Sequence, residues 1–418
     1  MTSTTADEQY LQQSIAEFSK QKPPKTSQRY EILEIAQRYL KLFEMPGRRD
    51  AHYFDKAEAA RSFLAGDDVI EVPVFVAGDG ANFSMLDRES HRRPIEQFLD
   101  FLHDLEEEHE YDDEIRSERR SRQFLSVGGI KARFLLNRQS PKYPRNFPDI
   151  PNPMFDHGVP QFIQNASCTV LHDIMRSVLA VDLDNICTCA AGDLEMPHSD
   201  HEITLPAFQA LGHAWRYWQS TVMLAEPGCI TYPHWDKYGT GTWIACLEGE
   251  IGFGWQAQTS METRSSWLDE VAEPTGEWLF KVLRPGDAVY MPPGTVHFVF
   301  RRPGGSQTMG FAGQMLRRAD LVGWLRCLKV ELEHELNEAI DDNAPYDLIA
   351  PWLLEGLTVL INTACKERDM EKFGGRDRVN ELLDLIEETE EVALESIELK
   401  KTKQRDDSIA VSDDTPES

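Results

Sequence analysis

Two histidines and one aspartate have the residue types and spacing of ligands to a single divalent metal. His234 and Asp236 lie two residues apart, after an apolar run from Thr221 to Ala225 and a Pro-Gly turn. Residues i and i+2 of a β-strand point to one face, so an imidazole and a carboxylate are expected to converge there. His297 offers a second imidazole. Two histidines and one carboxylate make a facial triad, which suits non-haem iron(II) because it leaves coordination positions open.

Two tight turns precede His297. Pro285-Gly286-Asp287 is expected to turn the chain, Ala288 to Met291 to form a short strand, and Pro292-Pro293-Gly294 to turn it again. His297 then begins an apolar strand that runs to Arg301. A lone histidine on a strand is usually a hydrogen-bonded core residue, but here two rigid turns fix its position, as a metal ligand requires.

These segments reproduce both sequence motifs of the cupin superfamily. The first motif has a glycine, five residues, a histidine, one residue and an acidic ligand. The second has a glycine, five residues, a proline, one residue, a glycine, two residues and a histidine. The motif positions are Gly228, His234 and Asp236, and then Gly286, Pro292, Gly294 and His297.

Within the cupins, the sequence resembles the JmjC family. The resemblance is carried by Trp215-Arg-Tyr-Trp218, by Thr231 three residues before the first histidine, and by Gly241-Thr-Trp-Ile-Ala-Cys-Leu-Glu-Gly249. It covers about residues 205–316. A fainter upstream match lies at Val72-Pro73-Val74 and at Asn146-Phe147-Pro148-Asp149.

The resemblance implies a fold, an activity and cofactors. JmjC proteins have a mainly β core, a double-stranded β-helix or cupin jelly roll, and use iron(II) and 2-oxoglutarate to hydroxylate side chains or demethylate methyl-lysine. It assigns iron to the triad, with no catalytic residue beyond those ligands. Thr231 and Thr242 match positions that contact 2-oxoglutarate, although either could equally be a strand residue hydrogen-bonded across the ladder.

One expected residue is missing. JmjC enzymes usually carry a lysine two or three residues after the glycine that matches Gly249, and this chain has Ile251 and Gly252 there. A buried carboxylate is costly unless it is paired. Because side chains alternate along a strand, Arg301 is expected to point inward with His297 and could supply the missing positive charge. Lys281 is the second candidate for this role. The alternative is that Arg301 is exposed at the end of its strand.

The pattern along the chain divides it into four parts. Residues 1–68 are expected to form a helical segment, 69–318 the JmjC/cupin domain, 319–402 a second helical segment, and 403–418 a disordered tail. Helices are predicted at 30–43, 57–64, 321–336, 346–360 and 378–401. The charge-dense residues 103–123 are expected to form a helix or a loop.

Composition limits the classes of partner. A formal charge of −28 argues against direct binding to nucleic acid, which depends on clustered lysine and arginine. With no apolar stretch long enough to span a membrane and no secretory leader, an intracellular location is expected, cytoplasmic or nuclear. The substrate could be a protein or small-molecule side chain, and the sequence leaves it and the oligomeric state open. Two other functions remain: a non-catalytic JmjC-like domain that binds metal or a partner, and a cupin enzyme that binds metal without 2-oxoglutarate.

Overall fold

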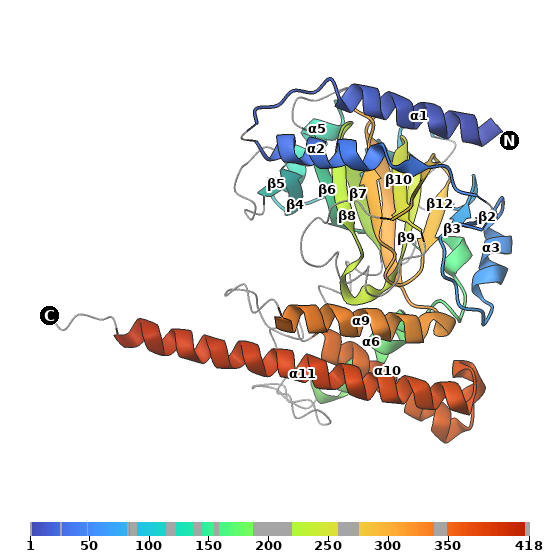
Figure 1. Ribbon diagram of the computed structural model, residues 1–418, viewed down its shortest axis with the longest axis vertical. Helices are drawn as coiled ribbons and strands as arrows, with labels where there is room; N and C mark the ends of the chain where they lie inside the picture. Colours follow the sequence, from blue (N-terminus) through green and yellow to red (C-terminus); the bar gives the residue numbers. More distant parts are fainter. Residues whose placement is uncertain are drawn as a thin grey trace.

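Two β-sheets packed face to face form the centre of the molecule, and helices flank them (Figure 1). The computed structural model describes residues 2–25, 27–47, 49–81, 83, 90–113, 123–136, 144–153, 159–186, 220–257, 276–337 and 349–413. The Trp215-Arg-Tyr-Trp218 motif lies outside these residues.

Among the described residues one sheet has five strands and the other has nine. The order of the five-stranded sheet is β1-β11-β10-β13-β8, and that of the nine-stranded sheet is β2-β3-β12-β9-β14-β7-β6-β4-β5. Neighbouring strands are antiparallel except in the pairs β1–β11 and β2–β3, which are parallel. The strands are β1 (Phe43–Glu44), β2 (His52–Phe54), β3 (Val74–Val76), β4 (Glu108–Asp113), β5 (Gln123–Ser126), β6 (Arg145–Pro151), β7 (Thr221–Ala225), β8 (Ile230–His234), β9 (Gly241–Glu248), β10 (Ile251–Gln256), β11 (Trp278–Leu283), β12 (Ala288–Met291), β13 (His297–Phe300) and β14 (Thr308–Met315).

An apolar lumen separates the two sheets. Alternate residues of β9 and β10 point into it, including Ile244, Cys246, Ile251, Phe253 and Trp255. The residues between them point outward, as period-two side-chain alternation requires. A residue can therefore be assigned to the lumen face or the outer face of its strand from the residues that precede and follow it.

Helices α1 (Thr2–Phe18) and α2 (Gln28–Leu40) cover the outer face of the five-stranded sheet (Figure 1). The contact is aromatic: the rings of Tyr39 and Phe298 stack with centroids 5.7 Å apart, and those of Phe43 and Phe280 at 5.6 Å. Gly254 makes room for this layer, because a Cβ there would overlap the ring of Phe43.

The N-terminal part contains strands as well as helices. The predicted helices correspond to α2 and α3 (Ala57–Leu64), but β1 and β2 also lie within residues 1–68 and extend the two sheets. The expectation for residues 103–123 was wrong in part, because β4 pairs there with β5 and β6. Helices α4 (Pro94–Phe101) and α5 (Val127–Phe134) pack against the outer face of the larger sheet.

Four helices form a separate apolar cluster across one end of the sheets (Figure 1). They are α6 (Val170–Ile186), α9 (Leu321–Asn337), α10 (Ile349–Glu367) and α11 (Arg376–Asp413). Helices α9, α10 and α11 confirm the helices that periodicity predicted around 321–336, 346–360 and 378–401. The predicted disordered tail differs from the structure, because α11 continues past Lys403 to Asp413. No helix in the described ranges combines the length and hydropathy needed to cross a membrane.

Candidate metal centre

The three predicted ligands meet at one point. One ligand atom from each of His234, Asp236 and His297 lies within 4.8 Å of the other two. The rings of the two histidines have centroids 4.3 Å apart, and His234 Nε2 lies 3.9 Å from Asp236 Oδ1. His297 is 3% exposed, whereas the side chains of His234 and Asp236 are 40% and 22% exposed. The cluster therefore lies at the rim of the lumen, where solutes can reach it.

Hydrogen bonds to the backbone set the tautomer of both imidazoles. His234 Nδ1 lies 2.7 Å from the carbonyl oxygen of Tyr232, and His297 Nδ1 lies 3.1 Å from that of Thr295. A carbonyl oxygen can only accept, so each Nδ1 carries the proton and donates it. Each Nε2 is then left with a lone pair, which is the state that a metal ligand needs.

Electrostatics keeps the deeper imidazole neutral. Burial and, to a smaller extent, the neighbouring His234 lower the pKa of His297 to about 4, while Asp236 and the hydrogen bond to Thr295 act in the opposite direction. At neutral pH the imidazole of His297 is therefore uncharged and able to donate a lone pair.

A bulge in β8 aims His234 into the lumen. His297 pairs with His234 and Val299 pairs with Thr231, so β8 advances three residues where β13 advances two. The extra residue reverses the side-chain alternation, which lets Thr231 and His234 face the same side. Regular strand geometry would have placed one of them outside.

Asp236 reaches the cluster from a turn rather than from a strand. β8 ends at His234, and Asp236 immediately precedes the helical turn η3 (Lys237–Gly239). The expectation that His234 and Asp236 share a strand face was therefore wrong, although the two side chains do converge. The Asp236 carboxylate makes no capping hydrogen bond to the turn, so its oxygens remain available.

Polar side chains line the lumen beside the triad. Asn146 Nδ2 donates to Thr231 Oγ1 at 3.3 Å, and Asn146 belongs to the upstream segment that the sequence had indicated faintly. Thr242 pairs with Gln314 across β9 and β14, and both lie on the lumen side, in register with Ile244 and Ala312. Thr242 Oγ1 and Gln314 Oε1 are buried, and within the described residues neither has a hydrogen-bond partner. Sequence reasoning missed Gln314, because no motif marks its position.

Arg301 lies deep in the lumen, at the end away from the triad. It is 2% exposed, and its Nε donates to Thr308 Oγ1 at 3.2 Å. Burial raises the pKa of the lumen-facing Cys246, and the positive charge of Arg301 opposes that rise. The alternative that Arg301 is exposed at a strand end is therefore wrong.

Lys281 faces the gap between the edges of the two sheets. It follows Leu279 and precedes Leu283 on the lumen side of β11. Its Nζ lies 3.7 Å from Asp7 Oδ2 and 5.8 Å from the centroid of the Phe75 ring. This ammonium group is already held by an anion and an aromatic face.

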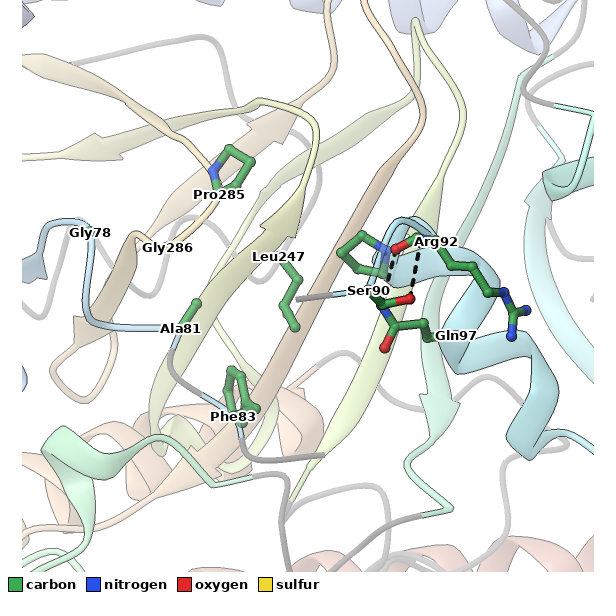
Figure 2. A pocket seen from close by; sticks show the side chains of 10 residues that line it. Gly78, Ala81, Phe83, Ser90, Arg92, Gln97, Leu247, Pro285 and Gly286 are labelled. Atoms are coloured by element: carbon green, nitrogen blue, oxygen red, sulfur yellow. Dashed lines mark hydrogen bonds between the residues drawn. The ribbon is translucent and has the colours of Figure 1, made fainter. Parts of the chain in front are cut away.

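A cavity of about 300 Å³ lies elsewhere, beside the opposite end of β9 (Figure 2). Phe83 and Leu247 line it, together with Arg92 and Gln97. The Arg92 side chain points away from the cavity in Figure 2, and its guanidinium pairs with Asp100 at 2.6 Å. None of the three predicted metal ligands lines this cavity.

No protein-family model matches the chain, and no curated protein matches it either.

Proposed function

We propose that this chain is a JmjC-type oxygenase whose double-stranded β-helix holds iron(II) at His234, Asp236 and His297 and takes 2-oxoglutarate as cosubstrate. The observation that carries the proposal is the convergence of one imidazole nitrogen from each histidine and one carboxylate oxygen of Asp236, all within 4.8 Å of one another. This donor set suits non-haem iron(II). When bound, the metal would supply open coordination positions for the cosubstrate and oxygen.

The protein's own residues would hold and orient the reactants. The backbone carbonyls of Tyr232 and Thr295 fix the two imidazoles, so that both ligands are preorganised before the metal arrives. The aromatic walls Phe253 and Trp255 exclude water from the lumen, which strengthens every charge interaction inside it. Such exclusion also protects reactive species from side reactions.

Arg301 is the residue that we assign to the distal carboxylate of 2-oxoglutarate. Ile251, where the family carries lysine, is fully buried and cannot pair with an anion. Arg301 comes from the neighbouring part of the lumen and can bind a carboxylate with two parallel hydrogen bonds. Thr231 and Thr242 are the assigned polar contacts nearer the metal, and the unpartnered Oγ1 of Thr242 supports this assignment. Lys281 is the second candidate, although its ion pair with Asp7 holds it at the edge of the sheet.

One observation favours an alternative function. The apolar Ile251 and the aromatic filling of the lumen suit a JmjC-like domain that binds metal but does not turn over 2-oxoglutarate. Such a domain would act as a metal-binding or interaction module. The substrate of the oxygenase is proposed to be a side chain of a protein or small molecule, presented at the exposed rim beside His234.

Release of labelled carbon dioxide from 2-oxoglutarate by the iron(II)-loaded protein tests the proposal. We expect turnover that depends on iron(II) and is absent in His297→Ala. Metal binding without any decarboxylation would support the non-catalytic alternative. Absence of metal binding would reject both.

A further inference from the structure

The loop that carries Asp236 has an unusual backbone. Tyr238 has φ 61° and ψ 18°, and Gly239 follows with φ 59°. An L residue rarely adopts this left-handed conformation, so neighbouring structure must hold Tyr238 there. The amide of Gly239 donates to the carbonyl oxygen of Asp236 at 3.2 Å, which ties the strained residues directly to the metal-binding aspartate.

Helix α9 supplies the contacts that hold this loop. Trp324 Nε1 donates to the carbonyl oxygen of Tyr238 at 2.9 Å, and both groups are buried. Gly239 lies against the helix, since an added Cβ would come within 2.5 Å of Cys327 Cβ. Figure 1 shows α9 next to the end of the sheets at which this loop lies.

The same helix also reaches the other side of Asp236. Trp235 shares an apolar cluster with Cys327, and Tyr238 shares a second cluster with Trp324. Asp236 therefore sits between two anchored aromatic residues, and α9 takes part in both anchors. A shift of α9 would move the backbone on either side of the carboxylate.

We propose that Trp324 is a positioning residue that sets Asp236 for metal binding, and that metal affinity is thereby coupled to the packing of the C-terminal helices. The inference rests on the proposed metal-binding function. Because Trp324 touches the loop and not the ligand atoms, it acts through the Tyr238 carbonyl. Coupling of this kind is reciprocal, so metal binding must in turn order α9.

Titration of the full-length protein with Co(II), followed by calorimetry and by the visible spectrum of bound Co(II), tests this role. Trp324→Phe keeps an aromatic ring, although one smaller than the indole, and removes the N–H donor. We expect Co(II) affinity to fall by more than about tenfold, as for other groups that orient metal ligands, and the spectrum to change. Trp352→Phe is the matched control, since Trp352 lies in the same apolar cluster on α10. It should change affinity by less than about threefold.

Equal Co(II) affinity and spectra in Trp324→Phe and the wild type would overturn the inference. A wild-type protein that binds neither Co(II), Mn(II) nor Fe(II) would overturn the proposed function as well, so the two failures are distinguishable. If Trp324→Phe does not fold, hydrogen exchange of the wild-type protein tests the coupling between the metal site and α9 instead. Co(II) should slow exchange of the amides of α9 near Trp324 but not those of α4, and no slowing at α9 would overturn the coupling.

Discussion

At the scale of single residues, hydrogen bonds as well as residue type determine which atoms of the candidate metal site can act as ligands. The same two histidines with Nδ1 unbonded could present either nitrogen, and the site would lose its fixed geometry. The carbonyls of Tyr232 and Thr295 remove that freedom. The sequence predicted the three ligands from their spacing, but it could not predict the carbonyls, because every residue carries one.

The first residue-scale prediction concerns metal content. The purified wild-type protein should bind about one Co(II) or Mn(II), and His234→Ala should abolish binding, because two ligands cannot replace three. His103→Ala, at an exposed position, is the control and should bind as the wild type does. Elemental analysis after dialysis measures the effect. Unchanged metal content in both His234→Ala and Asp236→Ala would refute the triad.

The second residue-scale prediction concerns the buried cation. Arg301→Ala should raise the concentration of 2-oxoglutarate needed for half-maximal decarboxylation by more than about tenfold, which corresponds to roughly 1.4 kcal/mol or more. Co(II) affinity should stay unchanged. Arg302→Ala is the neighbouring control, because Arg302 pairs with Glu17 outside the lumen. A larger effect from Lys281→Ala than from Arg301→Ala would reassign the cation to β11.

At the scale of elements, irregular backbone segments determine the positions of the three predicted ligands more than the regular strands do. The bulge in β8 and the left-handed turn after Asp236 bring the ligands together. The sequence predicted most helices and the lumen strands from periodicity. It did not predict the bulge, because the bulge is defined by the register of β8 against β13, which lies more than sixty residues further along the chain. The sequence pattern also did not indicate β4. Most of its residues are charged, so the alternation of apolar and polar residues that marks a strand is missing.

The element-scale prediction concerns Gly239. Gly239→Ala should lower the free energy of unfolding by roughly 1–3 kcal/mol, because the added Cβ meets α9 and the backbone is left-handed. Gly323→Ala, within α9, should instead raise it by about 0.5–1 kcal/mol, since nothing lies within 4 Å of its added Cβ and alanine favours a helix. Urea denaturation measures both. A free energy of unfolding of Gly239→Ala equal to that of the wild type would show that Gly239 is not closely packed against α9.

At the scale of the whole molecule, a buried arginine joins parts of the chain far apart in sequence. The guanidinium of Arg317 binds both carboxylate oxygens of Asp320 and donates to the carbonyls of Leu64 and Gly66. It thus links the end of α3 to the start of the C-terminal helices. The carbonyls of Leu64 and Gly66 could not be predicted from the sequence as partners of Arg317, because these contacts depend on the complete fold.

The whole-molecule prediction concerns this link. Arg317→Met should lower the free energy of unfolding by about 3–5 kcal/mol, because it leaves the buried Asp320 carboxylate without a positive charge, with hydrogen bonds from Tyr290 and Ile70 alone. Arg326→Met, which breaks the exposed pair with Glu381, should cost at most about 1 kcal/mol. Chemical denaturation compares the two. Equal losses would mean that Arg317 contributes no more than a surface ion pair.

The parallel pairing of β1 with β11 has a consequence for the protein during its synthesis. Phe43 aligns with Trp278, so the partner of β1 leaves the ribosome more than two hundred residues later. At ordinary elongation rates this delay is roughly ten to fifty seconds. Throughout that interval the aromatic side chains of α1, α2 and β1 have no sheet to cover. The nascent chain must therefore expose these aromatic side chains during that interval, and exposed apolar surface of this kind favours aggregation unless a chaperone covers it.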